Sequence, residues 1–198
     1  MKKLAIFDLG QVCVRIHVDR CFEHWKKLSG EDVLDETRFD DASHDKYERG
    51  EIGAGELWTA LRRSMGLGLS DEEWLKGWNS IFGEVIEETR STVAKMKEAG
   101  LRVVVLSNTN REHVEIWMPM YQHFMDMFDC VYVSNELGAR KPERRIYERV
   151  LELENVEGRE CVFFDDKIEN IAAANLLGIE GVHFVADSVA AEWWAKNG

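Results

Sequence analysis

Acidic side chains, a serine, an asparagine and a lysine stand beside short apolar runs that have the length of β-strands. The positions are Asp8, Ser107, Asn108, Lys141, Asp165 and Asp166. Carboxylates are ligands that Mg²⁺ prefers, and a carboxylate can also attack phosphorus. A lysine ammonium and a hydroxyl can balance the charge on the other phosphate oxygens. These side chains therefore favour phosphoryl transfer, provided that the fold brings them together.

Five apolar, β-branched runs are the elements that must position these residues. They are residues 4–7, 103–106, 130–133, 161–164 and 182–185. Segments with helical periodicity separate the later runs, and one of them ends at Gly178, a residue type common at helix C-termini. This alternation predicts an α/β fold, a doubly wound, Rossmann-like parallel sheet with helices on both faces. Ligands bind at the carboxyl ends of such strands, so the positions above would share one edge of the sheet.

The interval between the first two predicted strands is too long for one βαβ unit, which needs about 30 residues. Apolar residues recur in this interval at helical spacing. We therefore expect a small helical cap domain, residues 16–88, inserted into a core domain made of residues 1–15 and 89–198.

The most regular helical pattern in the cap runs from Trp74 to Ile86. Ser70 and Glu73 precede it with the spacing of a capping box, which begins many helices. We predict one helix through this stretch, with its tryptophans packed in the interior of the cap.

Four short motifs occur in order along the chain: FDLG at 7–10, LSNTN at 106–110, RKPE at 140–143 and FFDD at 163–166, with Asn170 after the last. They resemble the ordered motifs of the haloacid dehalogenase superfamily, which inserts its helical cap after the first motif. The similarity is greatest to the bacterial α-D-glucose-1-phosphate phosphatases and the epoxide-hydrolase-like phosphatases. Four motifs in the right order are far more specific than any one of them.

The resemblance implies how the acidic residues would act. Asp8 would be the nucleophile that takes up the phosphoryl group as an aspartyl phosphate. The Asp8 carboxylate, the backbone carbonyl of Gly10 and the Asp166 side chain would hold Mg²⁺, with Asp165 and Asn170 in the surrounding shell. Mg²⁺ commonly takes one or two carboxylates and a substrate phosphate oxygen, so this ligand set is chemically reasonable.

The resemblance also implies how the phosphate would be bound. Ser107 and the backbone N–H of Asn108 would hold the phosphate at a helix N-terminus. Lys141 would lie between the phosphate and Asp8, where it would act in binding and in catalysis. The Lys141–Pro142 peptide is expected to be cis, as in relatives with the same pair.

The sequence departs from the superfamily pattern at Gly10, where most of the phosphatases carry a second aspartate that acts as general acid and base. Loss of such a group commonly costs about 10² to 10⁴ in rate. One interpretation is a phosphatase for esters with good leaving groups, such as glucose 1-phosphate. A metal-independent haloacid dehalogenase also lacks this aspartate, but Asp165 and Asp166 argue against it. A non-catalytic protein that binds phosphosugars is the third.

Arg49 lies in the inserted segment, within the run Glu48-Arg49-Gly50-Glu51. Caps of this kind place a loop that reads the substrate in this region. We therefore predict that Arg49 contacts the substrate.

The composition limits the partners of the protein. The 198 residues include 25 lysines and arginines against 37 aspartates and glutamates, a net charge of −12 that repels nucleic acids and anionic membranes. The four cysteines form no CxxC pair, and no stretch resembles a signal peptide or a membrane span. We expect a cytoplasmic protein whose partner is a small phosphate ester, and the sequence does not indicate an oligomeric state.

Overall fold

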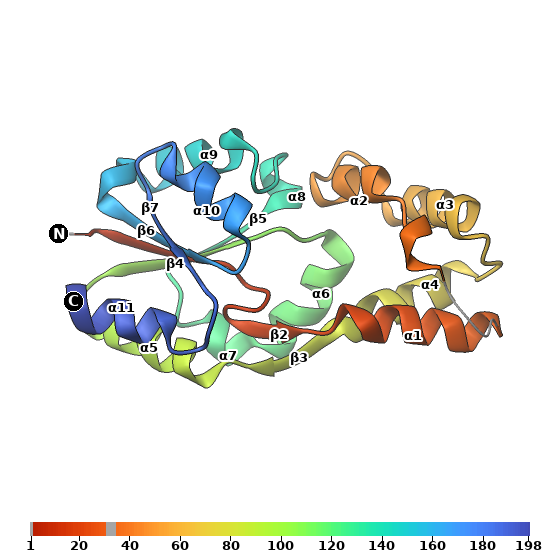
Figure 1. The fold of residues 1–198 in the computed structure, drawn as a ribbon, viewed down its shortest axis with the longest axis horizontal. Coiled ribbons are helices and arrows are strands. Elements are labelled where there is room, and N and C mark those ends of the chain that lie inside the picture. The colour runs from red at the N-terminus through yellow and green to blue at the C-terminus, as the bar shows by residue number, and fades with distance from the viewer. Residues whose placement is uncertain (1, 31–34) are drawn as a thin grey trace.

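The computed structural model describes residues 2–30 and 35–198, and its centre is a parallel sheet (Figure 1). Five strands lie in the order β5-β4-β1-β6-β7, which confirms the predicted doubly wound α/β sheet. Their bounds are β1 (Leu4–Phe7), β4 (Arg102–Ser107), β5 (Cys130–Val133), β6 (Cys161–Asp165) and β7 (Glu180–His183). The last strand lies two residues earlier than predicted, because it pairs with β6 from Glu180 opposite Val162 to His183 opposite Asp165.

Helices cover both faces of the sheet (Figure 1). Side chains alternate along a strand, so Ala5 and Phe7 of β1 enter one apolar layer while Leu4 and Ile6 enter the other. The first layer is covered by α5 (Glu87–Glu98), α6 (Arg111–Met120), α7 (Gln122–Met125) and α11 (Val189–Asn197). The second is covered by α8 (Ser134–Leu137), α9 (Arg144–Glu154) and α10 (Ile168–Asn175), and the 3₁₀ turn η3 (Gly158–Glu160) precedes β6.

The inserted segment forms a helical body beside the sheet, at the right of Figure 1. Its elements are α1 (Val18–Ser29), η1 (Glu36–Arg38), α2 (Asp41–Glu48), α3 (Ala54–Met65), α4 (Asp71–Trp78) and η2 (Asn79–Ile81), where η marks a 3₁₀ turn. Trp25, Trp58, Trp74 and Trp78 belong to an apolar cluster of this body that is separate from the two layers at the sheet. The prediction that the cap tryptophans pack against one another is therefore confirmed.

The helix predicted from Trp74 to Ile86 is wrong in its second half. The capping box at Ser70 begins α4 as expected, but the helix ends at Trp78. After η2, the chain forms β3 (Phe82–Val85), which pairs antiparallel with β2 (Val14–Ile16).

Local residue types explain why the helix stops. Glycine and asparagine are poor helix formers, and Gly77, Asn79 and Gly83 all lie in this stretch. A Cβ atom at Gly83 would lie only 2.7 Å from the His17 ring, so the strand needs glycine there. Phe82 and Val85 pack against the apolar layer of the core, as strand residues beside the sheet can.

The β2–β3 ribbon connects the two bodies, because it lies where the chain leaves the core and where it returns. Residues 16–88 remain our proposed extent of the cap. Within residues 2–30 and 35–198, no helix combines the length and the apolar character that crossing a membrane requires.

Candidate active site

The central strands bring the predicted acidic residues together. Asp8 follows β1, and Asp165 ends β6, the strand that pairs with β1. One carboxylate oxygen each of Asp8, Asp165 and Asp166 lies within 4.8 Å of the other two. The sheet thus gathers the three carboxylates at its carboxyl edge, as the strand pattern indicated.

Lys141 is the counter-charge of this cluster. Its Nζ atom lies 2.7 Å from Asp8 Oδ1 and 2.7 Å from Asp165 Oδ2. The lysine is 2% exposed, so its ammonium is held almost out of water. Contacts of this length in buried surroundings hold the side chains in fixed positions.

Asn108 holds the backbone of Lys141 in position. The Lys141 N–H donates to Asn108 Oδ1 at 2.8 Å, and Asn108 Nδ2 donates to the Lys141 carbonyl at 2.9 Å. These two hydrogen bonds tie the loop after β4 to the loop before α9 at the site. The Lys141–Pro142 peptide is cis, as expected from the resemblance.

Asp165 differs from its neighbour Asp166 in its contacts. Both Asp165 oxygens accept from Asn170 Nδ2, at 2.9 and 3.0 Å, and Oδ1 also accepts from the Lys167 N–H at 2.8 Å. Asp166 is half-buried and lines the cavity described below. Asp165 therefore orients Lys141 and Asn170, whereas Asp166 faces the space that a ligand would enter.

The carboxylates repel one another. Burial raises the pKa of Asp8 to about 7, with further contributions from Asp165 and Asp166, while Lys141 opposes the rise. Burial and then Asp165 raise the pKa of Asp166. Three carboxylates against Lys141 and Lys167 still leave one negative charge uncompensated. A divalent cation bound by Asp8, Asp166 and the carbonyl of Gly10 would balance it, and this all-oxygen donor set suits Mg²⁺.

Gly10 leaves room for a side chain beside Asp8. Its φ is not positive, and a Cβ atom there would meet only Ile16 Cγ1, at 3.2 Å. The next residue, Gln11, has a φ of 60°, and its N–H donates to the Val14 carbonyl at 2.8 Å. The turn therefore depends on Gln11, and Gly10 could accept a side chain after a small shift of Ile16.

A cavity of about 800 Å³ extends from the carboxylates to the cap. Its core side is lined by the predicted residues Asp8, Gly10, Ser107, Asn108, Lys141 and Asp166. Its cap side is lined by residues of α1, α2 and η2 and by the start of β3. A ligand that reached the carboxylates with one end would therefore place its other end against the cap.

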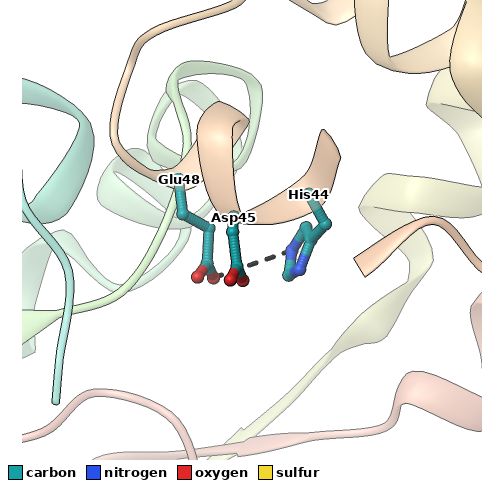
Figure 2. A group of neighbouring side chains, drawn as sticks. All are labelled: His44, Asp45 and Glu48. Carbon is teal, nitrogen blue, oxygen red and sulfur yellow. Dashed lines mark ion pairs between the residues drawn. The ribbon is translucent and has the colours of Figure 1, made fainter. Parts of the chain in front are cut away.

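Sequence reasoning missed part of the cap side. His44, Asp45 and Glu48 of α2 point in the same direction (Figure 2) and line the cavity together with Arg140 of the core. The spacing of the three residues on one helix face, and the position of Arg140 beside Lys141, were the available signals.

Two predicted site residues do not line the cavity in the part of the chain that the structure describes. Asp165 is fully buried and contacts Lys141, and Arg49 lies outside the cavity wall. Its guanidinium pairs with Glu51 at 2.7 Å and with Glu143 at 3.0 Å. Glu51 belongs to the inserted segment and Glu143 to the core. The contact with Glu143 therefore joins the cap to the core.

Comparisons with known proteins agree with this geometry. The pattern of the family described as haloacid dehalogenase-like hydrolase matches residues 2–178. A D-ribitol-5-phosphate phosphatase of Bacteroides thetaiotaomicron is 30% identical over 190 residues, which cover 91% of this chain and 90% of that protein. A sesquiterpene phosphatase of Aspergillus oryzae is 28% identical over 193 residues, covering 95% of this chain and 92% of that protein.

A solved structure is similar over the same extent. It is a haloacid dehalogenase family enzyme from Bacteroides thetaiotaomicron, in complex with magnesium and inorganic phosphate. The TM-score is 0.79 at 29% identity, over 92% of this chain and 94% of that one.

Proposed function

The chain belongs to the haloacid dehalogenase-like hydrolases and is a magnesium-dependent phosphoric monoester hydrolase, and from this premise we propose that its substrates are sugar 1-phosphates such as glucose 1-phosphate. The observation that carries the proposal is the buried contact of Asp8 with Lys141, beside Asp166 and at one end of a cavity large enough for a sugar.

Asp8 is the proposed nucleophile. One of its carboxylate oxygens attacks phosphorus, the bond from phosphorus to the sugar oxygen breaks, and an aspartyl phosphate forms. Lys141 holds Asp8 in place and offsets the repulsion between the carboxylate and the anionic phosphate. Bound Mg²⁺ would supply further positive charge at Asp8, Gly10 and Asp166.

The second half of the reaction regenerates Asp8. Water attacks the aspartyl phosphate, the bond from Asp8 to phosphorus breaks, and inorganic phosphate leaves. Ser107 and the backbone N–H of Asn108 lie at the same end of the cavity and are the proposed phosphate-binding groups.

Gly10 supports the choice of 1-phosphates. An ordinary alkoxide is strongly basic and needs a proton as it departs, and this position offers no acid. An anomeric oxygen is stabilised by the adjacent ring oxygen, so it departs more readily as an anion. Esters of the anomeric hydroxyl therefore depend least on the missing group.

A panel of phosphate esters tests the proposal. Glucose 1-phosphate, glucose 6-phosphate and p-nitrophenyl phosphate are assayed with Mg²⁺ and with EDTA. We expect Mg²⁺-dependent hydrolysis, with kcat/KM much higher for the 1-phosphate than for the 6-phosphate. A preference for the 6-phosphate would overturn the leaving-group argument.

A binding measurement and a 2-haloacid, added to this panel, distinguish the two alternatives. Binding of glucose 1-phosphate without turnover would indicate a non-catalytic phosphosugar-binding protein. Release of halide from a 2-haloacid in EDTA would indicate a dehalogenase.

We also propose a cytoplasmic location, which is supported by free thiols at Cys13, Cys21, Cys130 and Cys161.

A further inference from the structure

One face of α2 forms a polar rim at the cap end of the cavity. His44, Asp45 and Glu48 project from the helix in the same direction (Figure 2), and an oxygen or nitrogen of each lies within 4.8 Å of the others. All three line the cavity that also contains Asp8. We call these three residues and Arg140 the α2 rim.

Arg140 reaches this helix from the core. Its Nη1 atom lies 2.7 Å from Asp45 Oδ1, and its Nε atom lies 2.7 Å from Glu48 Oε2. A guanidinium has five N–H donors, so these two contacts use only part of its capacity. Arg140 thus orders both carboxylates and retains donors for a further acceptor.

The rim combines donors and acceptors of the kind that hydroxyl groups need. Burial is the main cause that lowers the pKa of His44, so its ring is neutral near pH 7 and presents one donor and one acceptor. His44 Nε2 lies 3.7 Å from Glu48 Oε1, which is beyond hydrogen-bond distance. A polyhydroxy alcohol could therefore bond to the imidazole, the carboxylates and the guanidinium.

Aromatic side chains stand beside the rim. The His44 ring makes edge-on contacts with Phe39 at 5.5 Å and Trp78 at 5.4 Å between ring centroids. Phe39 and Trp78 are themselves parallel, with an interplanar angle of 6°. All three residues line the cavity, which gives the apolar face of a ring-shaped alcohol a surface to contact.

The net negative charge of the rim disfavours an anionic group on the part of the ligand that contacts it. With His44 neutral, Asp45 and Glu48 outweigh Arg140 by one negative charge, and Asp41 and Glu36 add two more carboxylates to the wall. A phosphate group at the core end meets Lys141 instead. A second anionic group on the same substrate would have to leave water and face this negative wall, which costs binding free energy.

We propose that the α2 rim is the alcohol-binding end of the substrate cavity, and that it admits an uncharged polyhydroxy alcohol while rejecting one that carries a second anionic group. This inference rests on the proposed phosphatase function and deepens it. The rim residues act on substrate choice, whereas the chemistry stays with Asp8 and its neighbours.

The test compares glucose 1-phosphate with glucose 1,6-bisphosphate, which share the leaving group at C1 and differ in charge at C6. Two quantities are measured: kcat/KM for each sugar ester, and the inhibition constant of each against p-nitrophenyl phosphate hydrolysis. We expect the wild type to favour glucose 1-phosphate about tenfold or more, since tenfold corresponds to a free-energy difference of about 1.4 kcal/mol.

Asp45→Asn removes one negative charge with little change in shape, and Asp45 is half-exposed. We expect this variant to reduce the preference for glucose 1-phosphate severalfold, and Glu48→Gln to do the same. Lys46→Ala is the matched control, because Lys46 lies on the same helix but on its exposed side.

A wild type that binds the bisphosphate as tightly as the monophosphate would overturn the inference, as would an unchanged preference in both rim variants. Failure of the proposed function would give a different result from failure of the inference about the α2 rim. If neither sugar ester is hydrolysed but the aryl phosphate is, the substrate proposal fails, and the inhibition constants still decide whether the rim selects by charge.

Discussion

The two ends of the cavity hold their side chains in different ways. At the core end, Lys141 and Asp165 are almost fully buried, and their charged atoms lie 2.7 Å apart. At the cap end, Arg140 pairs with Asp45 and Glu48 at the same distance, but His44 and Asp45 are partly exposed to water.

This difference separates catalysis from selection. Groups that stabilise developing charge must be fixed in advance, because any rearrangement would cost free energy at the moment of reaction. Groups that only sort substrates tolerate more motion, and they lie on a body that two strands join to the core. Loss of a reacting or metal-binding group at the core end should therefore affect all substrates alike, whereas changes at the cap end should affect some substrates more than others.

Asp8→Asn should have the largest effect. The amide has nearly the same shape but is barely nucleophilic, so we expect turnover to fall by about 10⁴ or more. The loss should be equal for glucose 1-phosphate and p-nitrophenyl phosphate, as measured by steady-state kinetics. Circular dichroism would show the fold retained. A residual rate close to that of the wild type would rule out covalent catalysis through Asp8.

Asp166→Ala should come next. We expect the Mg²⁺ concentration for half-maximal activity to rise by about tenfold or more, because one of the proposed ligands is lost. A magnesium titration of activity measures the shift, which should again be the same for both substrates. Glu169→Ala is the control, since Glu169 is exposed on the following helix. An unchanged titration in Asp166→Ala would remove this residue from the metal site.

Gly10→Asp should separate the effect of the leaving group from the effect of the cap. It changes how strongly the rate depends on the leaving group, and it substitutes no residue of the α2 rim. The new carboxyl group would supply the missing acid, and a small shift of the Ile16 side chain would make room for it. We expect glucose 6-phosphate hydrolysis to rise by about tenfold or more relative to 1-phosphate hydrolysis. Gly10→Asn has the same shape without the acid and should show no such change. An equal gain in both variants would contradict the proposed role of the carboxyl group.

His113 should have the smallest effect on activity and a visible effect on stability. This core residue contacts the carbonyl of Trp78 in the cap at 2.9 Å, and burial lowers its pKa to about 3. The unfolded chain takes up a proton near pH 6.5, and the folded protein does so only near pH 3. Unfolding therefore binds a proton within this window, and the free energy of unfolding falls as the pH drops through it.

Urea unfolding at pH 7 and pH 5 measures this contribution. The wild type should lose about 2 kcal/mol more than His113→Gln between these two values, because the variant has no imidazole to protonate. Equal losses in the two proteins would mean that the pKa of His113 is the same in the folded and unfolded states. Activity at pH 7 should be similar in both.

The core end was far easier to predict from the sequence than the cap end. Asp8 and Asp165 follow β-branched runs, and parallel pairing brings the carboxyl ends of such runs to one edge. The apolar runs predicted the strands of the central sheet, and this rule then predicted that the carboxylates converge.

The cap end depends on contacts between residues that are distant in sequence. Arg49 was chosen from its place in a loop, but its charge is taken up by Glu51 and Glu143. His44 and Arg140 are 96 positions apart, and only packing of the cap on the core brings them to one wall. The strand β3 was missed because Phe82 and Val85 also fit a helical period.

The two ends of the inserted segment lie side by side, since Ile16 is paired with Phe82. A segment whose ends are this close can be replaced by another of different length without pulling on the sheet that it interrupts. The β2–β3 ribbon thus allows the cap to be exchanged for another domain. Grafting a foreign cap at this ribbon would give the same phosphoryl-transfer centre a new set of alcohols, and evolution could take the same route.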